Sequence, residues 1–143
     1  MSELRTGVRH TASLEDLQAL AVDLWSNLEH GAVVWLTGDL GSGKTAFVQA
    51  LAQVAQAEPA LSPTFALIHE YLAPEGVLVH VDCYRLRSPE EALDLDLPEL
   101  TARARMTLIE WPERAGVFVP EPDAHVTFAH THDPACRLVE RIA

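Results

Sequence analysis

The sequence has little positive charge. Its 10 lysines and arginines stand against 21 acidic residues, which gives a formal net charge of −11. Proteins bind nucleic acid with clustered basic side chains, so an excess of acidic residues disfavours direct binding of nucleic acid by this chain. Any role near RNA would run through a partner protein, and a bound phosphate would be held by local geometry rather than by a general positive field.

Cysteines and long apolar runs are also scarce. Cys83 and Cys136 lie far apart without metal-ligand spacing, which excludes a structural zinc site and favours reduced thiols. No apolar run approaches the roughly 18 residues of a membrane span. The N-terminus shows neither the apolar core nor the cleavage motif of a signal peptide. We therefore expect a cytoplasmic protein without membrane attachment.

The 143 residues suit one domain with a single core, and no repeat, low-complexity tract or linker divides them. A capping-box pattern at Ser13 and Asp16 predicts a helix whose apolar stripe begins at Leu14 and which stops near Gly31. Residues 32–38 predict a buried strand and residues 46–57 a second helix. Two strands are expected over residues 65–72 and 77–86, joined by a tight turn.

The second half of the chain continues this alternation. Ser88 and Pro89 predict the start of a short helix, interrupted at Pro98 and followed by a further turn or two. Residues 106–111 read as a buried strand, and residues 123–131 and 136–142 as a closing hairpin. The whole chain, residues 1–143, is therefore expected to form one α/β domain.

The segment GDLGSGKT matches the phosphate-binding pattern G-x-x-x-x-G-K-[ST] at every required position. It follows a predicted strand and opens a predicted helix, as that pattern requires. Its glycines let backbone N–H groups ring a phosphate, and the helix N-terminus favours an anion. The expected nucleotide-binding residues are Gly38, Asp39, Leu40, Gly41, Ser42, Gly43, Lys44 and Thr45.

Lys44 is the only lysine in the chain, and every other basic residue is arginine. A compact ammonium can reach the β- and γ-phosphates from this position, whereas a planar guanidinium is too wide. The retained lysine therefore indicates a site where arginine fails. Thr45 is expected to place its hydroxyl on Mg²⁺.

Two predicted strands end in a carboxylate that could complete the magnesium site, Asp82 and Glu110. Such a site takes an acidic ligand from the end of a neighbouring strand, and either residue can supply it. Thr64, in SPTF, could direct its hydroxyl at the γ-phosphate and metal as switch loops do. A rigid turn fixed by Pro63 is the equal alternative.

Other side chains near these motifs have less specific interpretations. Arg85 could contact phosphate or a partner, or pair with a surface acid. The pattern alone favours packing for Trp111. His130 and His132 are expected on one face of a strand and, lacking a third ligand nearby, towards solvent.

The motifs GDLGSGKT, SPTF, HVDCYRL and LIEWPE occur in this order and together resemble the TsaE (YjeE) family of small bacterial P-loop ATPases. The resemblance covers nearly the whole chain. It implies a three-layer P-loop fold with a mostly parallel central sheet and antiparallel edge strands. It also implies slow ATP hydrolysis in tRNA threonylcarbamoyladenosine (t6A) modification, together with the TsaD and TsaB proteins, with tRNA contacted only through that complex.

The resemblance also assigns roles to residues. It implies that Lys44 binds phosphate, and that Thr45 and Glu110 bind Mg²⁺. Asp82 is implied as a required acid at the same metal site, and Thr64 as the switch-like threonine. The catalytic set is then Lys44, Thr64, Asp82 and Glu110.

Three further positions follow from the same resemblance. Trp111 is implied as the functional tryptophan beside the nucleotide. Cys83 departs from the aliphatic residue more usual in the family, and we expect it to pack. Arg137 and the stretch before Ser13 are candidates for adenine contacts.

Two other functions are compatible with the phosphate loop. A nucleotide or small-molecule kinase would need an arginine-rich lid, which the sequence lacks. A nucleotide-binding scaffold would use ATP only to order an interface, with incidental turnover. A GTP switch is disfavoured because its N/T-K-x-D motif needs a second lysine.

Overall fold

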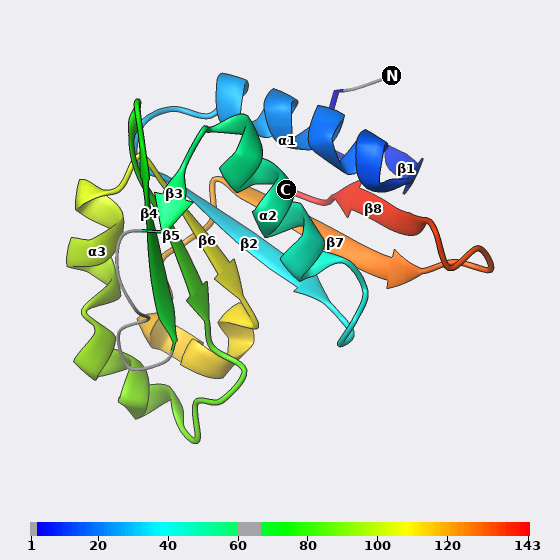
Figure 1. Ribbon diagram of the computed structural model, residues 1–143. Coiled ribbons are helices and arrows are strands. Elements are labelled where there is room, and N and C mark those ends of the chain that lie inside the picture. Colours follow the sequence, from blue (N-terminus) through cyan, green and yellow to red (C-terminus); the bar gives the residue numbers. More distant parts are fainter. Residues whose placement is uncertain (1–2, 60–66) are drawn as a thin grey trace.

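The computed structural model describes residues 3–59 and 67–143. In this part of the chain one sheet has the strand order β1-β8-β7-β2-β6-β5-β4-β3 (Figure 1). The four central strands β7, β2, β6 and β5 are parallel, and the outer strands on both sides pair antiparallel. The strands are β1 (Arg9–Ala12), β2 (Ala32–Gly38), β3 (Glu58–Pro59), β4 (Ile68–Ala73), β5 (Gly76–Asp82), β6 (Met106–Glu110), β7 (Ala124–His130) and β8 (Arg137–Arg141).

Helices cover both faces of this sheet. Along β2, Val34 and Leu36 pack into a core with helices α1 and α2, whereas Val33 points to a second core on the opposite face. This alternation follows from the two-residue period of a strand. The predicted three-layer α/β fold with a parallel centre and antiparallel edges is thus confirmed. The helices are α1 (Leu14–Asn27), α2 (Lys44–Val54) and α3 (Leu97–Arg103), with 3₁₀ helices η1 (Pro89–Leu95) and η2 (Pro112–Phe118).

Helix α1 begins at the predicted capping box. The Ser13 hydroxyl accepts from the Asp16 amide, and the Asp16 carboxylate accepts from the Ser13 amide. Two details of the prediction were wrong. The helix ends at Asn27, before Gly31, and Leu14 is 70% exposed because the buried stripe begins one turn later, at Leu17.

The predicted interruption at Pro98 was also misplaced. The break between η1 and α3 falls at Asp96, whose φ of 48° is left-handed, and Pro98 lies in the first turn of α3. Proline suits that position because the first amides of a helix have no intrahelical acceptor. The edge strands β1 and β3 were not predicted at all. Among residues 3–59 and 67–143, no helix has the length and apolarity needed to cross a bilayer.

A buried guanidinium joins the sheet to the end of α1. Arg105 donates from Nη2 to the carbonyl of Trp25 at 2.7 Å and from Nη1 to that of Glu29 at 3.3 Å. Its Cζ lies 4.6 Å from the centre of the Trp25 ring. The side chain therefore satisfies the Trp25 carbonyl in the last turn of α1, gives the Glu29 carbonyl a second donor beside the Ala32 amide, and adds a cation–π contact.

Replacing Arg105 by leucine should lower the free energy of unfolding by about 2–3 kcal/mol, because the buried Trp25 carbonyl loses a charged donor and the Trp25 ring loses its cation–π contact. Urea denaturation measures the change. The matched control is Arg103→Leu, which removes only an exposed ion pair to Glu70 at 3.4 Å. That variant should change stability by less than about 1 kcal/mol. Equal effects of the two substitutions would contradict the role given to Arg105.

Candidate functional site

The glycine-rich loop runs from the end of β2 to the first residue of α2. Gly38 has a φ of 148°, and a Cβ there would collide with the carbonyl oxygen of Phe128 and lie 2.7 Å from Ser42 Oγ. Gly43 caps α2 with a φ of 114°. Both positions exclude other residues because side chains rarely adopt such a φ and no space is left beside Gly38. The loop thereby brings its backbone close against β7.

Lys44 is held against this loop. Its Nζ donates to the carbonyls of Gly38 and Asp39, the latter at 3.2 Å, and lies 4.4 Å from the centre of the Trp111 ring. The residue is 5% exposed. Burial lowers the pKa of the ammonium, and the carboxylates of Glu110, Asp82 and Asp39 oppose that shift. The negative charges of these nearby carboxylates therefore favour the protonated, positively charged form of Lys44.

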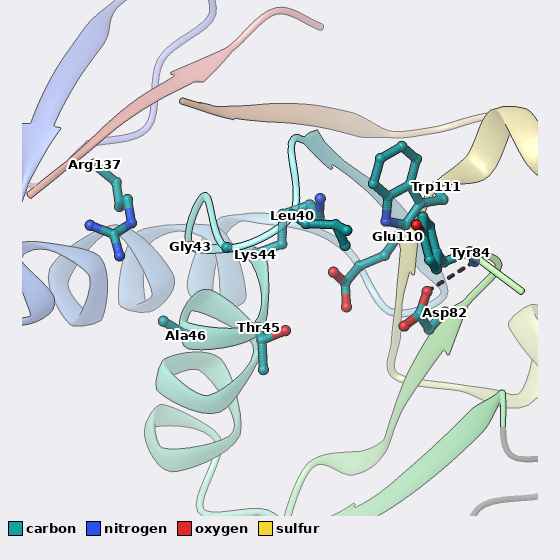
Figure 2. Close-up of a pocket in the computed structure, with 11 residues that line it drawn as sticks. Leu40, Gly43, Lys44, Thr45, Ala46, Asp82, Tyr84, Glu110, Trp111 and Arg137 are labelled. Atoms are coloured by element: carbon teal, nitrogen blue, oxygen red, sulfur yellow. Dashed lines mark hydrogen bonds between the residues drawn. The ribbon is translucent and has the colours of Figure 1, made fainter. Parts of the chain in front are cut away.

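A cavity of about 270 Å³ opens beside Lys44. Thr45 comes from the first turn of α2, and Asp82 and Glu110 come from the ends of β5 and β6. Asp82 and Glu110 are partners in the parallel register, so both carboxylates leave the same edge of the sheet. Figure 2 shows them facing the opening together with the Thr45 hydroxyl. The lining consists of Leu40, Gly41, Gly43, Lys44, Thr45, Ala46, Asp82, Tyr84, Glu110, Trp111 and Arg137.

The two acids have different surroundings. Glu110 is buried, and its Oε2 lies 2.5 Å from Nε2 of the equally buried His80. Asp82 is half-buried and accepts a hydrogen bond from the Tyr84 amide at 3.0 Å. Sequence reasoning missed His80, although its position two residues before Asp82 on the same strand places both side chains on one face.

His69 completes this row of side chains. It pairs with His80 across β4 and β5, and the two rings stack with centroids 5.5 Å apart at 26°. Burial, and then the neighbouring His80, lower the pKa of His69, while Asp82 and Glu110 oppose the shift. His69 is therefore biased towards the neutral form.

Trp111 and Tyr84 form an aromatic wall of the cavity, and Arg114 packs against their rings. Trp111 has a left-handed φ of 55°, and its ring lies 5.0 Å from that of Tyr84. Arg114 places its Cζ 4.9 Å from the Tyr84 ring and 5.6 Å from the Trp111 ring. Trp111 also packs against the second core. Trp111 therefore both packs against a core and lines the cavity beside Lys44.

The remaining predicted residues of the loop lie around the cavity rather than in its wall. Gly38, Asp39 and Ser42 are not lining residues among those described, and Ser42 is fully buried beneath Gly38. These three residues therefore shape the backbone of the loop and do not place side chains in the cavity wall as described. Thr64 lies outside the described residues.

Several other residues singled out in the sequence are not among the lining residues described. Arg85 is exposed and lies outside the cavity lining as described. His130 is exposed but contacts the Leu40 carbonyl through Nε2 at 3.3 Å. Strand β7 ends at His130, so the expectation that His132 shares its strand face was wrong. Cys83 is fully buried in the second core, in line with the packing expected of it.

The comparison with known families gives a clear match. The family model described as "Threonylcarbamoyl adenosine biosynthesis protein TsaE" matches residues 11–139. A tRNA threonylcarbamoyladenosine biosynthesis protein TsaE from Rickettsia bellii is 38% identical over 112 residues, which make up 77% of this chain and 77% of the relative. The protein of the same name from Aquifex aeolicus is 38% identical over 105 residues, 71% of this chain and 74% of the relative.

A solved structure supports the fold independently. The crystal structure of YdiB from Bacillus subtilis superposes with a TM-score of 0.74, covering 94% of this chain and 84% of that chain. Sequence identity between the two is 24%, so this likeness bears on architecture alone. It agrees with the three layers described above.

The burial of Cys83 predicts its reactivity. Burial, followed by the Asp82 and Glu113 carboxylates, raises the pKa of Cys83 to about 12, so its thiol stays protonated up to at least pH 10. With Ellman's reagent at pH 8 we expect one fast thiol per native chain, from the more accessible Cys136. The variant Cys136→Ser should show none until guanidinium is added. Two fast thiols in the native protein would contradict this packing.

Proposed function

This chain belongs to the TsaE family, and on that premise we propose that it binds and slowly hydrolyses ATP with Mg²⁺ in t6A biosynthesis. The observation that carries the proposal is the cavity in which the loop's single ammonium meets two carboxylates at the ends of neighbouring strands. A phosphate loop beside strand-end acids is the arrangement that nucleoside triphosphate hydrolysis uses.

Phosphate binding falls to the loop and Lys44. The ammonium has three N–H donors, and its contacts with the carbonyls of Gly38 and Asp39 hold it close to the N-terminus of α2. The N-terminus of α2 adds a favourable field for an anion. In a chain with a net charge of −11, this local arrangement supplies the attraction that the overall charge does not.

The residues around the cavity fit a magnesium ion. Thr45, Asp82 and Glu110 offer oxygen donors, the kind that Mg²⁺ prefers. No cluster of three or more histidine, cysteine or acidic side chains suited to a metal exists among residues 3–59 and 67–143. A partial protein shell suits Mg²⁺, which keeps waters and takes phosphate oxygens. When bound, the ion would neutralise phosphate charge, while Glu110 and Asp82 would hold it and Trp111 would shield the site from water.

A second cavity, next to the first, could hold the adenine base of ATP. It measures about 190 Å³ and shares Gly43, Ala46 and Arg137 with the first. Most of its remaining lining is apolar, which suits the face of adenine. That lining is Ala12, Ser13, Leu14, Leu17, Pro134 and Ala135.

The proposed setting is a cytoplasmic t6A complex. Other proteins of the complex, which we propose to be TsaD and TsaB, would contact the tRNA. The acidic charge of this chain supports that division of labour, because it makes direct contact with RNA unfavourable. ATP turnover should therefore be measured with and without purified TsaD, TsaB and tRNA.

The first test concerns Lys44. The variant Lys44→Arg should lose at least about tenfold in ATP affinity by calorimetry, because the wider guanidinium cannot occupy the ammonium's place between loop and indole. Arg103→Lys, an exposed exchange in the opposite direction, should bind ATP as the wild type does. Equal affinity of Lys44→Arg and wild type would count against this binding mode.

The second test separates an ATPase from a nucleotide-binding scaffold. Glu110→Ala should abolish Mg²⁺-dependent hydrolysis and t6A formation while circular dichroism shows a folded protein. Glu113→Ala, which removes a nearby exposed acid, serves as the control and should retain both activities. Full tRNA modification by Glu110→Ala without hydrolysis would support the scaffold instead.

A further inference from the structure

We propose that His80 positions the Glu110 carboxylate for the magnesium–nucleotide site. The inference rests on the proposed function, since it assigns a role towards the ligand of that same cavity. His80 is not among the cavity-lining residues described and reaches the site only through Glu110. It is therefore a positioning residue rather than a catalytic one.

The hydrogen bond between the two side chains is short and shielded from water. His80 Nε2 and Glu110 Oε2 are 2.5 Å apart, and the side chains are only 9% and 5% exposed. A carboxylate can only accept, so Nε2 carries the hydrogen of this bond. Because Oε2 is engaged by the imidazole, Oε1 is the oxygen left to face the cavity.

The imidazole is itself held in place. His80 lies on β5 two positions before Asp82, the register partner of Glu110, and its ring stacks on that of His69 from β4. A glutamate at a strand end otherwise has several rotamers, and ordering it costs conformational entropy. Two adjoining strands therefore fix the orientation of Glu110 before any ligand arrives.

Packing alone does not explain a histidine here. The residues that share its face, Leu78 on β5 and Leu108 on β6, are fully buried in the first core. An apolar side chain would suit such surroundings, because burying a polar ring costs free energy unless it is hydrogen-bonded. The bond to Glu110 supplies that compensation and couples the ring to the site. Residues that orient metal ligands in this way commonly change metal affinity or activity about 10- to 100-fold when replaced.

The test compares two amides that differ in length. In His80→Gln the amide nitrogen lies near the position of Nε2 and can donate to Glu110, whereas in His80→Asn it is too short to reach. Calorimetry with a non-hydrolysable ATP analogue, with and without Mg²⁺, measures how much Mg²⁺ increases affinity. Thr107→Val, on β6 but facing the other core, controls for the loss of a buried polar side chain from the sheet outside this site.

We expect His80→Asn to lose about 10- to 100-fold of the affinity gained with Mg²⁺, with binding in its absence unchanged. His80→Gln should recover most of the gain, and Thr107→Val should equal wild type. In turnover assays His80→Asn should lower kcat more than it raises KM for ATP. Thermal melting establishes that each variant is folded.

Three results would overturn the inference. A wild-type Mg²⁺ response in folded His80→Asn would show that the hydrogen bond is dispensable. An equal loss in His80→Gln and His80→Asn would show that the imidazole acts by shape rather than by donation. Absence of ATP-analogue binding by wild-type protein would instead refute the proposed function, and the inference with it, so the two failures are distinguishable.

Discussion

The attraction between one buried ammonium and the acids around it organises the functional end of this molecule. Lys44 lies between the carbonyls of its own loop and the face of Trp111, and the carboxylates of Glu110 and Asp82 counter the effect of burial on its pKa. In an acidic protein this is a small region of positive charge enclosed by negative charge. A phosphate or a metal ion entering the cavity meets a partner of opposite sign at once.

The parallel register of the central strands makes that enclosure possible. Strands β2, β6 and β5 lie side by side and end at the same edge, so the loop after Gly38 starts next to Glu110 and Asp82. Side chains two residues apart on a strand share a face, which brings His80 behind Asp82 and beside Glu110. The polar row His69–His80–Glu110 thus continues from the antiparallel edge of the sheet to the cavity.

Much of this site could be predicted from local sequence. The segment GDLGSGKT specifies its own backbone, because glycine at 38 and 43 is needed for the φ values and the close approach that the loop adopts. The capping box at Ser13 and the β-branched run of β2 were equally local signals. Elements whose partners are distant in the chain were harder, since β1 and β3 exist only through pairing with β8 and β4.

By itself the sequence determined the glycine-rich loop, the alternation of strands and helices and the two acids at strand ends, because each depends on neighbours within a few residues. Only the tertiary structure decided that Asp82 and Glu110 stand in register, that Glu110 is bound by His80, and that Trp111 covers Lys44. These contacts join residues about 30 or more positions apart. Their geometry depends on strand order and on the rotation of each side chain in the packed core, which no short stretch of sequence encodes.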